Sequence, residues 1–135
     1  MINYDLKKIK AVVFDVDGVL SASTVLMDEK GDPIRTINIK DGYAIQLAVK
    51  HGLQLAIMTG GHNENVRSRY EYLGVKDVYI NCSMKIKTWN DFLRKYDLKE
   101  EEIIYVGDDI PDYEVMTLAG CPCSVSYTHL TLPTN

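Results

Sequence analysis

Two aspartates that lie two residues apart, Asp15 and Asp17, follow a short apolar run and precede Gly18. The run, residues 12–14, is β-branched and aromatic without a helical period, which is typical of a buried strand. In an open α/β sheet, ligands bind at the carboxyl ends of the strands. Neighbouring carboxylates repel each other unless a proton or a cation compensates, and Mg²⁺ prefers such oxygen ligands. The motif predicts a site for magnesium and phosphate, although Asp and Gly also form simple turns at strand ends.

Three later segments supply further groups that this chemistry needs. Residues 55–58 form an apolar run that ends in Thr59-Gly60-Gly61, and residues 103–106 form one that ends in an acidic loop, residues 107–112. Between them, Lys85 opens a segment with helical spacing. Together these segments offer a hydroxyl with backbone N–H groups, an amine and a second acidic cluster. This set is what phosphate-ester hydrolysis assisted by magnesium requires.

The first two motifs suggest a division of roles. Asp15 is the candidate nucleophile, because a carboxylate can form an aspartyl-phosphate and divide hydrolysis into two easier steps; a purely metal-binding role is the alternative. Asp17 can protonate the departing alcohol and then activate the attacking water. Thr59 and the N–H groups of Gly60 and Gly61 precede a predicted helix, where an anion is readily held.

The other two motifs supply charge. Lys85 is expected to stabilise the phosphoryl group, with Lys87 as a rival that the spacing does not eliminate. Asp108 is the expected acidic ligand of Mg²⁺, and Asp109 is a candidate for a water-mediated ligand. Asp112 is expected either to orient Lys85 or to cap the following helix.

The composition is that of one small globular domain of 135 residues. A net charge of −4 and the lack of a basic stripe argue against a nucleic-acid partner. No apolar run reaches the length of a membrane span and no signal peptide is visible, which predicts a cytoplasmic protein. The three cysteines have no zinc spacing and are expected to be buried and reduced.

The elements that position these residues alternate between strands and helices. The expected strands are residues 12–14, 53–58, 77–80, 103–106 and 121–125. The expected helices are residues 42–51 with Asp41 as cap, residues 63–73, a helix with Ser83 as candidate cap, and one from near Pro111 to Gly120. This alternation predicts an α/β fold with a doubly wound parallel sheet.

An insertion, residues 23–39, separates the first strand from the first helix. Two apolar segments, residues 24–27 and 34–39, flank a polar turn and predict a β-hairpin that projects over the ligand edge of the sheet. We expect residues 1–125 to form the core with this insertion. Residues 126–135 carry no charge and no helical period, and we interpret them as a non-native or truncated tail.

The four motifs, in their order and spacing, resemble those of the haloacid dehalogenase superfamily. The resemblance runs from residue 10 to about residue 123, and the hairpin is too small to be the cap domain that most members have. In this respect the chain is similar to the capless phosphatases of 3-deoxy-D-manno-octulosonate (KDO) 8-phosphate. Relatives that act on phosphates of nine-carbon, sialic-acid-type sugars share the layout. The resemblance implies a Rossmann-like core and hydrolysis of KDO 8-phosphate to KDO and phosphate, in lipopolysaccharide precursor synthesis.

The same resemblance implies a ligand set and an assembly. Mg²⁺ would be held by Asp15, Asp108, Asp109 and the backbone carbonyl of Asp17. Substrate would be contacted by Arg69 and by the segment Asn38, Ile39, Lys40, Asp41 and Gly42. Members are tetramers in which a neighbour's hairpin and C-terminal tail complete each site, which would shield an otherwise open phosphoryl site from water.

The chain departs from the family pattern in three places. Gly61 stands where many members have an arginine, Gln46 stands where they have a second one, and the glycine- and arginine-containing tail is absent from this sequence. The first two departures bear on which sugar acid is bound. The third bears on activity.

Two other classes of function fit parts of the pattern. One is a non-catalytic, oligomerising domain of this fold, like that appended to some sugar-nucleotide synthetases; the complete set of acids and the lysine argues against it. The other is a phosphotransferase or receiver-like domain, which the Asp15–Asp17 pair and the hairpin disfavour.

Overall fold

The computed structural model describes residues 4–125, and a parallel five-stranded sheet forms their centre. The strands are β1 (Ala11–Phe14), β4 (Gln54–Met58), β5 (Asp77–Tyr79), β6 (Ile103–Gly107) and β7 (Cys121–Ser124), in the order β5-β4-β1-β6-β7. After β1, the chain adds β4 and then β5 on one side of β1, and it then crosses to the other side of β1 to add β6 and β7. The strand order therefore reverses between β1 and β6, which is where an open α/β sheet binds its ligands. The predicted doubly wound parallel sheet is confirmed.

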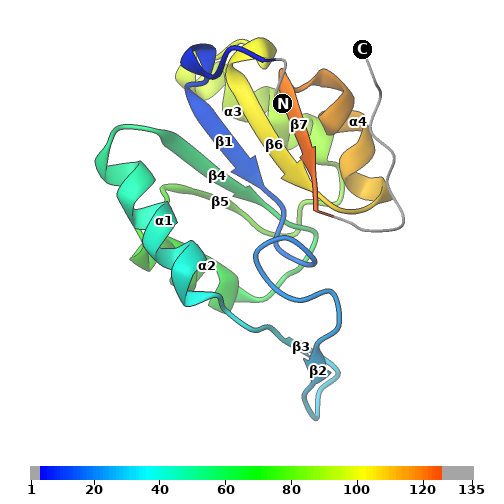
Figure 1. The fold of residues 1–135 in the computed structure, drawn as a ribbon. Helices are drawn as coiled ribbons and strands as arrows, with labels where there is room; N and C mark the ends of the chain where they lie inside the picture. The colour runs from blue at the N-terminus through cyan, green and yellow to red at the C-terminus, as the bar shows by residue number, and fades with distance from the viewer. Residues whose placement is uncertain (1–3, 126–135) are drawn as a thin grey trace.

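Helices cover both faces of the sheet (Figure 1). Helices α1 (Ile39–Lys50) and α2 (Glu64–Tyr72) cover one face, and α3 (Lys85–Tyr96) and α4 (Ile110–Leu118) cover the other. Successive side chains of a strand point to opposite faces of the sheet. Leu55 and Ile57 of β4 therefore belong to the hydrophobic core under α1 and α2, while Ala56 and Met58 belong to the core under α3 and α4. Two short 3₁₀ helices, Leu6–Lys8 and Glu100–Glu102, precede β1 and β6.

A buried carboxylate at the sheet edge anchors α3. Asp77 of β5 accepts hydrogen bonds from Lys95 Nζ, at 2.6 Å, and from the Tyr96 hydroxyl, both in the last turn of the helix. These contacts fix the end of α3 opposite to Lys85. Because Lys85 is the first residue of α3, these contacts help to fix its position over the sheet.

Two predicted helix caps are wrong. Helix α1 begins three residues earlier than expected, and its cap is Asn38, whose Oδ1 accepts a hydrogen bond from the Asp41 N–H at 3.1 Å. At α3 the N-cap is Met84, without a side-chain cap. Ser83 lies outside that helix because its N–H is used in a tight turn on Asn81, whose φ is +56°.

Helix α4 begins where the sequence predicts, with Pro111 in its first turn. Its cap is Asp109, whose Oδ1 accepts from the Ile110 N–H at 2.7 Å. Asp112 therefore has no capping role, which leaves the other predicted role, the orientation of Lys85.

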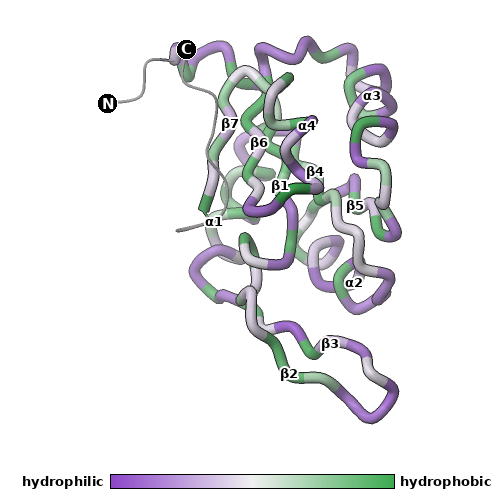
Figure 2. The backbone as a smooth tube through the Cα atoms, turned by 90° about the vertical axis from the view of Figure 1, so that its right-hand side faces the viewer, coloured by the Kyte–Doolittle hydropathy of each residue, from purple (hydrophilic) through white to green (hydrophobic). Residues whose placement is uncertain are grey.

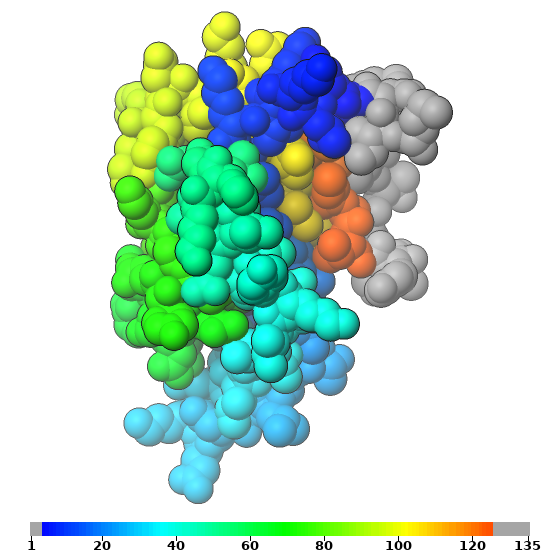
Figure 3. Space-filling view, turned by 60° about the vertical axis from the view of Figure 1, so that its left-hand side comes forward, coloured from blue at the N-terminus to red at the C-terminus, as the bar shows by residue number. Residues whose placement is uncertain are grey.

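The hairpin is much shorter than predicted. Strands β2 (Leu26–Met27) and β3 (Pro33–Ile34) pair over two residues each, so the expected strand over residues 34–39 is wrong beyond Ile34. After Ile34 the chain leaves the ladder, and the Arg35 side chain turns inward to Asp17. The hairpin projects from the carboxyl edge of the sheet, with an apolar stretch along β2 (Figure 2). In the space-filling view it protrudes beyond the start of α1 (Figure 3).

Three further predictions concern membrane spans, the cysteines and the end of the chain. Within residues 4–125 no helix is both long and apolar enough to cross a bilayer. The cysteines are unpaired as predicted, but only Cys82 is buried, while Cys121 and Cys123 are half-buried. The interpretation of residues 126–135 as a tail falls outside the described part of the chain.

Candidate active site

An open cleft of about 410 Å³ lies at the carboxyl ends of β1, β4 and β6, on the edge from which the hairpin departs (Figure 1). It is lined by residues of all four predicted motifs: Asp15, Asp17, Ser23, Thr59, Gly60, Gly61, Cys82, Ser83, Lys85, Asp108, Asp109, Pro111 and Asp112. The strand ends and the first turns of α3 and α4 thus bring together residues that are nearly 100 positions apart in the sequence.

A buried lysine links the candidate nucleophile to the acidic loop. Lys85 Nζ lies 3.1 Å from Asp15 Oδ1 and 2.5 Å from Asp112 Oδ1. Burial opposes the charge on Lys85, but the attraction of Asp15 and Asp112 outweighs it and raises the lysine pKa. The amine is therefore a fixed cation beside Asp15, whereas the rival Lys87 is exposed on the other side of the helix turn. The geometry favours Lys85 as the phosphoryl-binding lysine.

Asp112 is occupied on both of its carboxylate oxygens. Its Oδ1 also accepts a hydrogen bond from the Tyr105 hydroxyl at 2.6 Å, and its Oδ2 accepts from the Asp108 N–H at 3.2 Å. The side chain is fully buried. Asp112 thus orients Lys85 and the Asp108 backbone.

Asp15, Asp108 and Asp112 bring carboxylate oxygens within 4.8 Å of one another. Burial raises the pKa of the Asp15 carboxyl to about 7, with Lys85 opposing and Asp112 adding to the shift. Burial and the charge of Asp112 also raise the pKa of Asp108. Gly18 leaves room for this cluster, because a Cβ there would overlap Asp108 Oδ2. Since Asp112 is already occupied, Asp15 and Asp108 are the side chains that fit a hard divalent cation.

Two other predicted metal residues use their side chains elsewhere. The Asp17 carboxylate accepts two hydrogen bonds from Arg35, from Nε at 2.7 Å and from Nη2 at 3.0 Å. Asp109 caps α4 and is exposed. Their roles toward a metal, through a backbone carbonyl and through water, stay predictions.

The segment after β4 is bound tightly to its surroundings. Thr59 is buried, and its Oγ1 accepts from the Gly61 N–H at 3.2 Å. Its backbone bonds to Tyr79 and Cys82. The Gly61 N–H is thus already used, contrary to the expectation that it is free for an anion. Among residues 4–125 no hydrogen bond from the Gly60 N–H is found, which leaves that group and the Thr59 hydroxyl to face the cleft.

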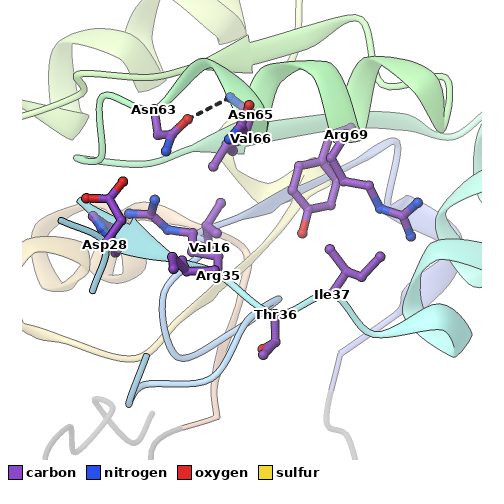
Figure 4. A pocket seen from close by; sticks show the side chains of 12 residues that line it. Val16, Asp28, Arg35, Thr36, Ile37, Asn63, Asn65, Val66 and Arg69 are labelled. Carbon is purple, nitrogen blue, oxygen red and sulfur yellow. Dashed lines mark hydrogen bonds between the residues drawn. The ribbon is translucent and has the colours of Figure 1, made fainter. Parts of the chain in front are cut away.

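The predicted substrate segment 38–42 lies outside the acidic cleft, at the start of α1. Gly42 is buried against α2, where a Cβ would come within 2.7 Å of Arg69 Nη2. Arg69 lines a second cavity of about 200 Å³ between the hairpin and α2. Figure 4 shows this cavity, with Asp28 and Arg35 on the hairpin side and Asn63 and Arg69 on the α2 side. The substrate contacts of residues 38–42 and Arg69 stay predictions.

Sequence reasoning missed Arg35 as a residue of the site. Only 11% of its side chain is exposed, although it follows directly on the exposed β3. Its position in an apolar strand pattern gave no local reason to single it out, because its partner Asp17 lies 18 residues away.

These features define a class of protein, and a family comparison agrees with them. The family description "Haloacid dehalogenase-like hydrolase" matches residues 43–125, which is more than half of the chain. The chain therefore belongs to the haloacid dehalogenase-like hydrolases.

Within this class, the chain is similar to several KDO 8-phosphate phosphatases. The chain is 34% identical over 123 residues to 3-deoxy-D-manno-octulosonate 8-phosphate phosphatase KdsC of Escherichia coli K12, covering 91% of this chain and 65% of that protein. The crystal structure of the Yersinia pestis phosphatase superposes with a TM-score of 0.86 at 27% identity, covering 91% of this chain and 68% of the other.

A third relative was solved with ligands. The Moraxella catarrhalis phosphatase, in complex with a magnesium ion, a phosphate ion and a KDO molecule, superposes with a TM-score of 0.79 at 29% identity, covering 85% of this chain and 66% of the other. The chain thus spans about two thirds of the length of the relatives it matches.

Proposed function

We propose that this chain is a Mg²⁺-dependent phosphomonoesterase whose substrate is a sugar-acid phosphate, KDO 8-phosphate in the first place. The observation that carries the proposal is the buried Lys85 held between Asp15 and Asp112, with Asp108 alongside. A carboxylate with a cation fixed beside it, at the switch point of the sheet, is placed to attack a phosphoryl group. The activity for which the relatives are named supports the same substrate class.

Hydrolysis would proceed in two balanced steps. First, an Asp15 oxygen attacks phosphorus; the bond from phosphorus to the ester oxygen breaks, and that oxygen keeps the electron pair and takes a proton from Asp17. Second, a water oxygen attacks the phosphorus of the aspartyl-phosphate, Asp17 takes a proton from the water, and Asp15 leaves as a carboxylate with release of phosphate.

The other residues bind and orient in both steps. Lys85 Nζ, 3.1 Å from Asp15 Oδ1, would bind a phosphoryl oxygen as negative charge develops. The Thr59 hydroxyl and the Gly60 N–H would bind another. Asp15 and Asp108 would hold Mg²⁺, which supplies further neutralisation of the phosphoryl oxygens when bound.

The direct test of substrate is a turnover screen with KDO 8-phosphate, phosphates of nine-carbon sugar acids and simple hexose phosphates. We expect Mg²⁺-dependent release of phosphate, with KDO 8-phosphate preferred; preference for a nine-carbon substrate would move the chain to the neighbouring subfamily. If no phosphate ester is hydrolysed, the chain is a non-catalytic domain of this fold.

Added Mg²⁺ should raise the melting temperature of the wild-type chain. A ligand at 100 times its Kd stabilises a folded protein by about 2.7 kcal/mol. The effect should disappear in Asp108→Ala and persist in Asp91→Ala, which removes an exposed acid of α3. Calcium is expected to bind but to support turnover poorly, because its longer and looser coordination misplaces the phosphoryl group. An unchanged Mg²⁺ response in Asp108→Ala, or equal turnover with both ions, would contradict this assignment.

We further propose that the hairpin mediates a homotetramer, the assembly that the family resemblance implies. Leu26, Met27 and Ile34 are 76%, 72% and 52% exposed, and such a cluster on a two-stranded ribbon is typical of a contact surface. Sedimentation should show an assembly in the wild type that is weakened by Leu26→Ser with Met27→Ser. Tyr72→Ser, at a site of α2 that is 79% exposed, is the control and should leave it unchanged. A wild-type monomer with high activity on a sugar-acid phosphate would refute the proposal.

A further inference from the structure

The Arg35 side chain is buried in a segment whose other side chains face solvent. Its exposed fraction is 11%, whereas its neighbours Ile34 and Ile37 are 52% and 54% exposed. A long charged side chain loses rotamer freedom when it is held in this way. A specific set of partners must therefore hold it inside.

Those partners come from two of the catalytic motifs. Nε and Nη2 of Arg35 bind the two carboxylate oxygens of Asp17, at 2.7 and 3.0 Å, in the bidentate geometry that a guanidinium favours. Gly61 makes room on the other side, because a Cβ there would lie 2.6 Å from Arg35 Nη2. The guanidinium thus lies between the second acid of the first motif and the segment that follows β4.

We propose that Arg35 is a positioning residue that sets the direction of the Asp17 carboxyl for proton transfer. The inference rests on the proposed phosphatase function, in which Asp17 gives a proton to the leaving oxygen and later takes one from water. A carboxyl that serves in both steps must keep one orientation, and two hydrogen bonds from a planar fork fix its plane. Asp17 Oδ1 also accepts from the Ser21 hydroxyl at 3.3 Å, whereas Oδ2 retains a second lone pair for the proton. The hairpin thereby contributes a group of this chain to its own active site.

A purely structural role, in which the pair only fastens the hairpin, predicts different behaviour. The Asp17 side chain is 49% exposed, and ion pairs at such sites contribute only about 0–1 kcal/mol to folding. Other contacts also hold the hairpin in place: Asp32 lies 3.2 Å from His62 Nε2 after β4, and the Thr36 hydroxyl accepts from the Ala22 N–H across the base of the hairpin. A fastening role would therefore be shared with these contacts, and its loss would affect every substrate alike.

The test compares two leaving groups. Protonation by Asp17 matters for a basic alkoxide, as in a sugar phosphate, but little for the weakly basic phenolate of 4-nitrophenyl phosphate. Arg35→Gln should lower kcat on the best sugar-acid phosphate about 10- to 100-fold, within the range of general acid–base catalysis, and change kcat on 4-nitrophenyl phosphate less than about 3-fold. Arg35→Lys should recover part of the loss. Asp32→Ala, which removes the other side-chain contact of the hairpin, that with His62, is the matched control and should show no such split.

A double-mutant cycle with Asp17→Asn completes the test. If Arg35 acts through Asp17, Arg35→Gln should lower kcat on the sugar-acid phosphate little further in a chain that already carries Asp17→Asn. Equal losses on both substrates, or full additivity in the cycle, would overturn the inference while leaving the phosphatase intact. A wild type without Mg²⁺-dependent turnover of either substrate would overturn the proposed function and this inference with it. If Arg35→Gln proves unstable, the same comparison is made with Arg35→Lys.

Discussion

Replacement of Asp15 by asparagine is expected to reduce phosphate release to background, a loss in kcat of at least about 10⁴-fold. A carboxamide of the same shape cannot form the acyl-phosphate, and the remaining groups only bind and polarise the substrate. The fold should survive, because Asp15 is a buried acid whose pKa is raised from 3.8 to about 7, so its ionisation lowers the free energy of unfolding progressively between these two pH values and fully above the higher one. A neutral isostere removes this cost. The melting temperature without metal should therefore be close to or above that of the wild type.

The matched control is Asp91→Asn, at an exposed acid of α3, which should change neither activity nor stability. Near-wild-type turnover by Asp15→Asn would rule out Asp15 as the nucleophile. Asp15 would then serve only as a ligand of the cation.

Replacement of Lys85 by methionine should lower kcat by about 10²- to 10³-fold, as the loss of one preorganised electrostatic contact to a transition state usually does. The same change should destabilise the fold, because Asp15 and Asp112 lose their shared counter-charge in a buried site. Removal of one partner of a buried ion pair typically costs about 3–5 kcal/mol. Kinetics and thermal melting of the purified variant measure the two effects separately.

Lys87→Met tests the rival lysine in the same helix. Lys87 is exposed, so its loss should leave both kcat and stability near the wild-type values. The opposite pattern, with Lys87 essential and Lys85 dispensable, would contradict the geometry of the site.

The parts of the fold that the sequence predicts best are those determined by local patterns. Strands β1, β4 and β6 are short apolar runs that end in polar turns, and their carboxyl ends meet where the alternation of strands and helices predicts. The grouping of Asp15, Thr59 and Asp108 follows from that topology, since parallel strands bring their ends to one edge of the sheet, and Lys85 joins them at the start of α3.

The features that the sequence does not predict depend on contacts between distant residues. The N-cap of α1 is Asn38 rather than Asp41. Both residue types are good caps, so only the path of the chain out of the hairpin decides between them. The hairpin ladder stops after two residue pairs, and the next residue, Arg35, binds Asp17, which lies 18 positions away in the sequence. Propensity and periodicity are local quantities and contain no information on such a pairing.

The central claim is that the acidic cleft hydrolyses a sugar-acid phosphate through Asp15 with the help of Mg²⁺. The most direct measurement is the release of inorganic phosphate from KDO 8-phosphate by the wild-type chain, with Mg²⁺ and with a chelator, beside Asp15→Asn under the same conditions. The account predicts turnover by the wild type that the chelator abolishes and that Asp15→Asn lacks. Turnover that persists in the chelator or in Asp15→Asn, or no turnover by the wild type with Mg²⁺, would contradict it.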